Sequence, residues 1–190
     1  MSSGEYAQLL NVMDVIVNVR DYEEKEIPDD VIKNVLTAFS YGPSLANQQP
    51  WELFHVQKDD QKERLVEATL DPFLTENSHG GQSWIINAPL IYVVFLEKRR
   101  TLARLGNLGQ EFAVEDAFCA VQNFRLAAAI QSLSTAVIRE FDKAKLKEGL
   151  GSAWYLEPIA ILTAGYSSAQ LELPPRFTPK DFVHKGGWDQ

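Results

Sequence analysis

The sequence of 190 residues contains a single cysteine, Cys119, and only three histidines. One cysteine excludes any disulfide within the chain and any cysteine-based zinc cluster. The histidines, His55, His79 and His184, share no metal-ligand spacing, so no metal site is predicted. Cys119 lies in an apolar helical stretch, and we expect it to be a small buried side chain rather than a reactive thiol.

The chain also has little positive charge. Lys and Arg number 18 against 26 Asp and Glu, which gives a net charge of −8. Binding to nucleic acid or to an anionic membrane needs a basic surface, because the release of counterions drives it, so neither partner is expected. A local basic pocket for a small phosphate remains compatible with this balance.

Long hydrophobic runs are missing as well. The most apolar stretches, residues 88–96 and 159–164, are far shorter than a membrane span, and the N-terminus does not resemble a signal peptide. We therefore expect a cytoplasmic protein. No linker or internal repeat divides the chain, and its length suits one domain, so residues 1–190 are predicted to form a single domain.

The apolar pattern predicts helices and strands in an order without a strict strand–helix–strand rhythm. Helical spacing occurs at residues 6–17, 29–39, 59–70, 111–132 and 143–150, and strand patterns occur at 51–56, 90–96, 134–138 and 158–165. Asp29 or Asp30 is expected to cap the second helix. This order favours an α+β fold, in which helices flank a small mixed or mostly antiparallel sheet around a long central helix, followed by an extended tail.

Residues 42–51 carry the strongest local signal. They read Gly-Pro-Ser-Leu-Ala-Asn-Gln-Gln-Pro-Trp and lie between a predicted helix and a predicted strand. A loop of this kind presents rigid hydrogen-bonding groups, which suits the recognition of a planar polar ligand. On local chemistry alone, an ordinary connection in which Asn and Gln satisfy turns explains the same residues.

The chain resembles the FMN-dependent nitroreductase superfamily along nearly its whole length. The family's first motif, Arg-Arg-Ser-x-Arg-x-Phe, corresponds to residues 16–22, and its Pro-Ser-x-x-Asn-x-Gln-Pro-Trp element corresponds to residues 43–51. Weaker matches follow in the family's order, at Ala88-Pro89, Gln122-Asn123, Gly165-Tyr166 and Arg176. The resemblance implies the nitroreductase-like α+β fold.

This resemblance also implies a flavin site. Arg20 takes the place of the motif arginine that reaches the flavin, and Asn18 replaces the family's serine beside the phosphate. Arg176 matches the tail arginine that pairs with the phosphate, and residues 43–47 match the loop that lines the flavin from the partner subunit. The predicted FMN-binding residues are Asn18, Val19, Arg20, Pro43, Ser44, Leu45, Asn47, Gln49, Gln82, Ile138, Arg139 and Arg176.

The chain departs from the family pattern at the phosphate and near the ring. Ile16 and Val17 stand where the family has arginines, and losing a phosphate-pairing charge is expected to cost about 1.5–3 kcal/mol. The glycine-rich ending of the central helix reads Gln-Ser-Leu-Ser at 131–134, and a charge, Arg139, lies in the segment that passes the flavin. FMN binding is still expected, with weakly held flavin.

The function that the resemblance implies is that of an FMN-dependent NAD(P)H oxidoreductase. A hydride would pass in ping-pong order from NADH or NADPH, through FMN, to a nitroaromatic, a quinone or a similar small-molecule acceptor. Because the cofactor carries the chemistry, no catalytic acid or base is predicted. The resemblance further implies a homodimer in which the tail, about residues 167–190, packs on the partner subunit.

Two alternatives from other classes stay open. A flavin-binding or storage protein without turnover is favoured by the lost arginines, and a degenerate structural dimer would keep the fold with an empty or repurposed pocket.

Two further groups of residues have both a functional and a structural interpretation. Lys98, Arg99 and Arg100, with Arg104, could meet the phosphates of a nicotinamide cofactor or form a solvated turn after a strand. Residues 80–82 could bring Gln82 to the edge of the flavin ring or form a plain loop.

Overall fold

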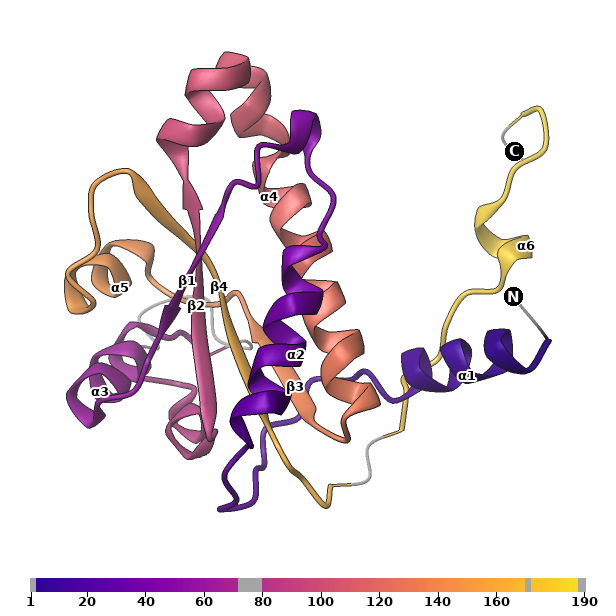
Figure 1. Cartoon of the computed structure of the whole chain (residues 1–190), viewed down its shortest axis with the longest axis horizontal. Helices are drawn as coiled ribbons and strands as arrows, with labels where there is room; N and C mark the ends of the chain where they lie inside the picture. The colour runs from indigo at the N-terminus through magenta and orange to yellow at the C-terminus, as the bar shows by residue number, and fades with distance from the viewer. Residues whose placement is uncertain (1–2, 72–79, 170–171, 188–190) are drawn as a thin grey trace.

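A four-stranded sheet forms the centre of the structure, a computed structural model that describes residues 3–71, 80–169 and 172–187 (Figure 1). The strands are β1 (Trp51–His55), β2 (Leu90–Glu97), β3 (Ser134–Ile138) and β4 (Leu156–Gly165). They lie in the order β1-β2-β4-β3, and every neighbouring pair is antiparallel. The predicted α+β fold with a small, mostly antiparallel sheet is confirmed.

Strand β2 is buried along its whole length, because helices cover both faces of the sheet. Successive side chains of a strand point to opposite faces. Tyr92 and Val94 therefore join the core on one side, and Ile91 and Val93 join the core on the other. A continuous apolar run is typical of such a strand, and here the sequence predicts the burial correctly.

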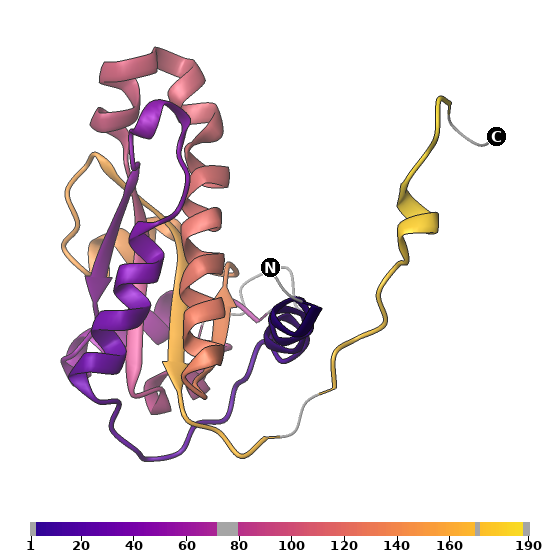
Figure 2. The same cartoon turned by 45° about the vertical axis from the view of Figure 1, so that its right-hand side comes forward.

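Helices α2 (Asp29–Ser40) and α4 (Lys98–Ile130) cover one face of the sheet and lie side by side (Figures 1 and 2). The buried stripe of α4 consists largely of small residues, namely Ala113, Ala117, Ala120 and Ala128. Small side chains let helices approach closely. Gly42, just after α2, lies so near to α4 that a Cβ added there would come within 2.5 Å of the Ala120 Cβ.

Three shorter helices cover the opposite face of the sheet: α3 (Asp59–Ala68), α5 (Lys143–Gly149) and the 3-10 helix η2 (Ser83–Asn87). Each contributes a fully buried side chain to this second core, Leu65, Leu146 and Ile85 respectively. The sheet is thus the middle layer of three.

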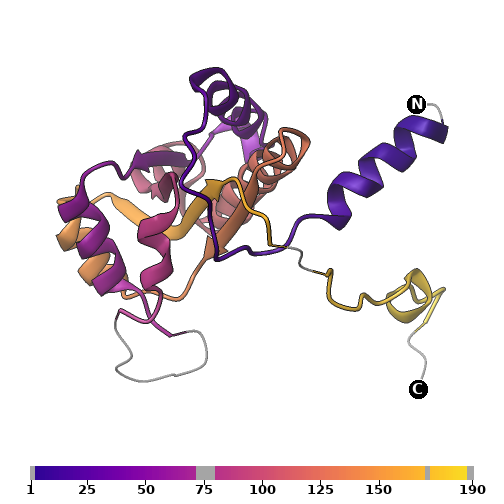
Figure 3. The same cartoon turned by 90° about the horizontal axis from the view of Figure 1, so that it is seen from below.

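The two ends of the chain project from this body instead of covering it. Helix α1 (Ser3–Asp14) and the tail with α6 (Pro179–Phe182) leave the body on the same side (Figures 1 and 3). Apolar side chains on both are exposed, among them Leu10, Phe177 and Phe182. Exposed apolar surface costs free energy in water, so burial of these segments against another surface would be favourable.

The predicted limits of the central helix were wrong. Helix α4 starts at Lys98 instead of residue 111, and it contains a break at Gly106, whose φ of 57° and ψ of −141° suit glycine. Cys119 is exposed instead of buried. Cys119 follows the buried Ala117 by two residues, which is a rotation of about 200° around the helix, so its side chain points away from the buried stripe. Among the described residues, no helix is long and apolar enough to cross a membrane.

The predicted cap of α2 was also wrong. Pro28 occupies the position before the helix, and it forms no side-chain hydrogen bond to the first turn. Asp29 and Asp30 lie inside that turn, where negative charge is favourable beside the positive end of the helix dipole.

A side chain at residue 42 should disturb the contact between α2 and α4. In Gly42→Ala, the new Cβ would lie 2.5 Å from the Cβ and 2.7 Å from the Cα of Ala120, so the two segments have to separate. We expect the free energy of unfolding, measured with urea, to fall by about 1–3 kcal/mol. Gly187→Ala is the control, because its new Cβ meets nothing within 4 Å. Equal stability of the two variants would contradict the close contact.

Candidate functional site

The segment that follows α1 runs along the edge strand β3. Asn18 forms a parallel bridge with Thr135, and the Val19 N–H donates to the Thr135 oxygen at 3.1 Å. The Asn18 amide extends this pairing, because its Oδ1 accepts from the Val137 N–H at 3.2 Å and its Nδ2 donates to the Val137 oxygen at 3.3 Å. One side chain therefore takes the part of a backbone peptide and fixes residues 18 and 19 to the sheet.

Arg125 projects from α4 toward the same edge. Its Nη2 donates to Asn18 Oδ1 at 3.1 Å, and its Nε donates to Thr135 Oγ1 at 3.1 Å. Partial burial lowers the pKa of Arg125, while the nearby Tyr22 raises it. Arginine keeps its proton in proteins at neutral pH, so this edge of the molecule carries a fixed positive charge.

A hollow of about 410 Å³ opens beside this cluster and is lined by Ile16, Val17, Asn18, Arg125, Glu172, Pro174 and Arg176. Arg176 belongs to the tail, so the fold brings together residues from opposite ends of the chain. Two guanidinium groups and an amide are donors that suit a phosphate, and the tail adds one carboxylate, Glu172. The apolar side chains of Ile16 and Val17 lie where the family pattern has arginines.

The predicted ligand loop, residues 43–49, lies between α2 and β1 and is held by α4. Asp116 Oδ2 accepts from the Leu45 N–H at 2.9 Å, and the buried Gln48 donates to the Gly109 oxygen at 3.4 Å. Around the 3-10 helix η1 (Leu45–Asn47), the backbone is left-handed at Ala46, Asn47 and Gln49, with φ of 51°, 53° and 45°. Such conformations persist only where the surroundings enforce them.

Hydrogen bonds within the loop use most of its predicted ligand groups. The Gln49 N–H donates to Ser44 Oγ at 3.0 Å, and Gln49 Nε2 donates to Asn47 Oδ1 at 3.0 Å. Pro43 is exposed beside them. These bonds hold the polar side chains of Ser44, Asn47 and Gln49 in place within the loop.

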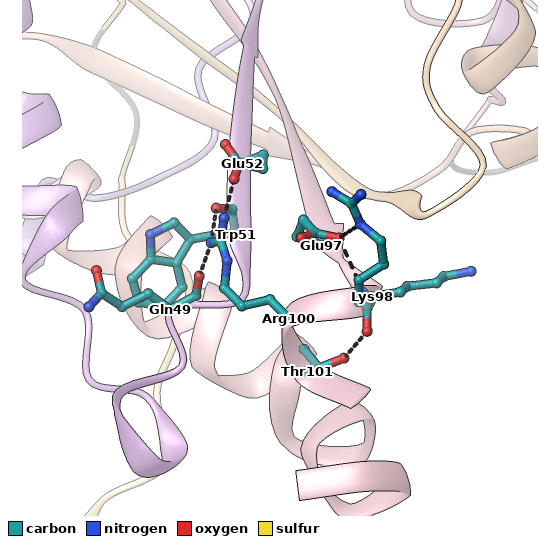
Figure 4. A network of polar contacts seen from close by, with 8 residues as sticks. Gln49, Trp51, Glu52, Glu97, Lys98, Arg100 and Thr101 are labelled. Carbon is teal, nitrogen blue, oxygen red and sulfur yellow. Dashed lines mark hydrogen bonds and ion pairs between the residues drawn. The ribbon is translucent and has the colours of Figure 1, made fainter. Parts of the chain in front are cut away.

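The end of the loop is tied to the start of α4 by Arg100 (Figure 4). Its guanidinium donates to the backbone oxygens of Gln49 and Trp51 and pairs with the carboxylate of Glu52. One arginine therefore joins the loop, β1 and α4.

The other members of the basic cluster have partners too. Arg99 pairs with Glu97 at 3.0 Å, and Lys98 pairs with Glu157 at 3.0 Å. Burial raises the pKa of Glu97, but hydrogen bonds from Arg99 outweigh it and leave that pKa below its usual value. The side chain of Arg104 lies outside the described part of the chain. These pairs favour the structural interpretation of the cluster over that of a nicotinamide site.

Three more of the predicted residues follow the open side of the sheet. Arg20 is exposed just beyond Val19, and Ile138 is buried at the end of β3. The exposed Arg139 places its guanidinium 4.9 Å from the ring of Phe118 on α4. Arg139 therefore lies near the same helix as Arg125, seven residues or about 10 Å of helix away.

Gln82 is buried within its own chain. Its Nε2 donates to the Leu70 oxygen at 3.0 Å, and its N–H donates to Thr69 Oγ1 at 3.2 Å. These bonds join Gln82 to residues 69 and 70, and residues 72–79 lie outside the described residues. Contact of Gln82 with a flavin ring stays a prediction.

A single chain does not bring the two parts of the predicted site together. The loop at 43–49 meets α4 at Asp116, whereas the hollow lies at Arg125, nine residues or about 14 Å further along the helix. The resemblance assigns that loop to the site of the partner subunit, and this assignment stays a prediction.

Arg125 was missed in the sequence. Its signal is a lone arginine among apolar and small residues, Phe-Arg-Leu-Ala-Ala-Ala at 124–129. A lone arginine in such a stretch predicts only a position of the helix that faces solvent. Its contact with Asn18 depends on how α4 lies across β3, which no local pattern reveals.

The comparisons with known proteins agree with this fold. A model of the nitroreductase family matches residues 18–166. A protein of Archaeoglobus fulgidus, provisionally named an NADH dehydrogenase/NAD(P)H nitroreductase, is 25% identical over 179 residues, which cover 90% of this chain and 93% of that protein.

Two solved structures share the fold. A nitroreductase family protein from Streptococcus pneumoniae has a TM-score of 0.74 and 21% identity, over 93% of this chain and 98% of that one. A protein from Staphylococcus epidermidis, provisionally named an NAD(P)H:FMN oxidoreductase, has a TM-score of 0.78 and 16% identity, over 93% and 95%.

Hydrogen exchange tests whether Asp116 holds the loop. In Asp116→Ala, the Leu45 amide loses a charged acceptor, and such bonds contribute about 1.5–3 kcal/mol. We expect the Leu45 amide to exchange roughly ten- to a hundredfold faster, as followed by NMR. Glu115→Ala, which removes the exposed neighbouring carboxylate, should leave the rate unchanged. An unchanged rate in Asp116→Ala would mean that other contacts hold the loop.

Proposed function

Because the chain belongs to the nitroreductase family, we propose that it is an FMN-dependent NAD(P)H oxidoreductase. The chemistry that FMN would supply is the ping-pong transfer of a hydride from NADH or NADPH and of electrons onward to a nitroaromatic, a quinone or a similar acceptor. The observation that carries this proposal is the hollow in which Asn18 and Arg176 meet. We also propose a cytoplasmic location, where NADH or NADPH would be available as the electron donor.

The residues around the hollow fit the phosphate end of FMN. A phosphate dianion is recognised best by guanidinium groups, and an exposed arginine of the tail lies here beside an amide and a second arginine. The protein has a net charge of −8, so it needs a local cluster of this kind to attract a dianion at all. The sequence holds no Gly-x-Gly-x-x-Gly motif for a dinucleotide, which favours FMN over FAD.

The remaining predicted residues would orient the ring. Arg139, stacked on Phe118, offers a positive charge about 10 Å along α4 from Arg125. The loop at 43–49 of a second chain would add polar groups that its left-handed backbone and internal hydrogen bonds keep in place. Fixed donors and acceptors of this kind set the polarity around a flavin ring and limit competing reactions.

We also propose an obligate homodimer with two shared sites. Eight of the exposed apolar side chains lie on α1, α4 and the tail: Tyr6, Leu9, Leu10, Met13, Phe112, Ile130, Phe177 and Phe182. A surface of this extent is unfavourable on a monomer. Because α1 and the tail project from the same side of the body, a second copy that bound there could cover both (Figure 3). Leu171 and Trp188, also expected in this contact, lie outside the described residues.

A flavin-binding or storage protein without turnover is the second candidate. Its support is the loss of the arginines at Ile16 and Val17, which leaves that wall of the hollow apolar. A degenerate structural dimer is the third, and it predicts a protein that binds no flavin.

Two measurements distinguish the oxidoreductase, the storage protein and the structural dimer: the identity of the bound chromophore, and the oxidation of NADH or NADPH by the protein. We expect heat to release FMN from the purified or reconstituted protein, as identified by chromatography, and we expect oxidation of NADH or NADPH to require an acceptor such as a quinone. FAD, or no flavin after reconstitution, would contradict the proposed cofactor. FMN without oxidation of either nicotinamide would favour the storage protein.

Removal of the tail tests the shared site. A chain that ends at Leu171 should lose the dimer and its FMN together, because the tail supplies both apolar contact and Arg176. Obligate dimer interfaces bury more than roughly 2,000 Å² in total, so light scattering of the full chain should show a dimer even in dilute solution. A stable monomer that still holds FMN would refute the shared-site proposal.

A further inference from the structure

We infer that Arg125 supplies the phosphate-facing cation that residues 16 and 17 lack, so that in this chain part of phosphate recognition comes from helix α4. This inference rests on the proposed function, since it assigns a residue to the FMN site. Its basis is the position of Arg125 in the wall of the same hollow as Asn18 and Arg176.

The guanidinium of Arg125 is held in place and still has free donors. Within the part of the chain that the structure describes, two of its five N–H groups donate, one to Asn18 Oδ1 and one to Thr135 Oγ1, and the other three have no acceptor. The two bonds tie the guanidinium to the edge of β3, and the same side chain lines the hollow. A preorganised fork loses less entropy when it binds an anion than a flexible lysine does.

The partners of Arg125 are neutral, unlike those of Arg64, Arg99 and Arg100. Arg64, Arg99 and Arg100 each pair with a carboxylate. Among the residues that the structure describes, no Asp or Glu lies within 4 Å of the Arg125 guanidinium. Partly burying a cation without a counter-charge is unfavourable, and burial lowers its pKa accordingly. An anion in the hollow would remove that cost.

The position of Arg125 compensates for a defined loss. Ile16 and Val17, which replace the family's arginines, line the same hollow, immediately before Asn18. Coulomb attraction depends on the distance between two charges and not on the helix or strand that carries them. A cation that reaches Asn18 from α4 can therefore attract a phosphate as well as a cation in the segment before Asn18 would. Arg176 approaches the same hollow from the tail and is its second cation.

A purely structural Arg125 would only join α4 to β3. Its loss would then weaken FMN and riboflavin equally, because riboflavin has the same ring and ribityl chain without the phosphate. A phosphate-binding Arg125 discriminates between the two ligands. The comparison of FMN with riboflavin therefore separates recognition of the phosphate from support of the fold.

The experiment measures the dissociation constants of both ligands by fluorescence quenching on the full-length, flavin-free protein. In Arg125→Gln, we expect the dissociation constant for FMN to rise roughly ten- to a hundredfold and that for riboflavin to stay unchanged. Arg125→Lys should recover part of the FMN affinity, since lysine keeps the charge but not the fork. Arg64→Ala is the control, because its guanidinium pairs with Asp60 on the opposite helical layer.

Each outcome decides between the proposals. Unchanged FMN affinity in Arg125→Gln, or an equal loss for both ligands, overturns the role of Arg125, and an FMN-specific loss in Arg176→Ala would then leave the proposed function intact. An unmodified protein that binds neither ligand overturns both the proposed function and this inference. Thermal melting of each variant identifies a loss of fold, and Arg125→Lys supplies a second test if Arg125→Gln unfolds.

Discussion

The alanine side chains of α4 lie directly against α2 and one face of the sheet, and this packing orients the polar residues of the helix beyond its break at Gly106. With Ala113, Ala117, Ala120 and Ala128 turned inward, other positions have to face the edges of the sheet. Asp116 then meets the loop at Leu45, and Arg125 meets Asn18. Because cores are close-packed, a shift of α4 would move both parts of the candidate site at once.

The charge of the molecule is arranged around the same helix. At the N-terminal end of α4, Lys98, Arg99 and Arg100 each pair with a carboxylate, and Arg100 joins the helix to β1 and the loop. Toward the other end, Arg125 and Arg176 line a hollow with a single carboxylate, Glu172. The cations around this hollow would favour an anion, although the protein as a whole carries a net charge of −8.

The exposed apolar ends of the chain connect this site to association. Segments that project from a body without covering it, such as α1 and the tail, gain stability only when another surface buries them. The tail also carries Arg176, and the loop at 43–49 lies about 14 Å along α4 from the hollow. In the proposed dimer, burial of the ends and completion of the flavin site are therefore one event.

The sequence by itself determined the elements and the fold class. Period-2 and period-3.6 patterns, such as the continuous apolar run of β2, depend on neighbours in the chain, so they can be read locally. The motif at 43–51 and the resemblance also pointed to Asn18 and Arg176 as neighbours. Only the tertiary structure decided that α4 starts at Lys98, that Cys119 is exposed and that Arg125 reaches Asn18. Those facts depend on contacts between segments far apart in the chain, and no local pattern of residues encodes the direction in which one helix crosses a sheet.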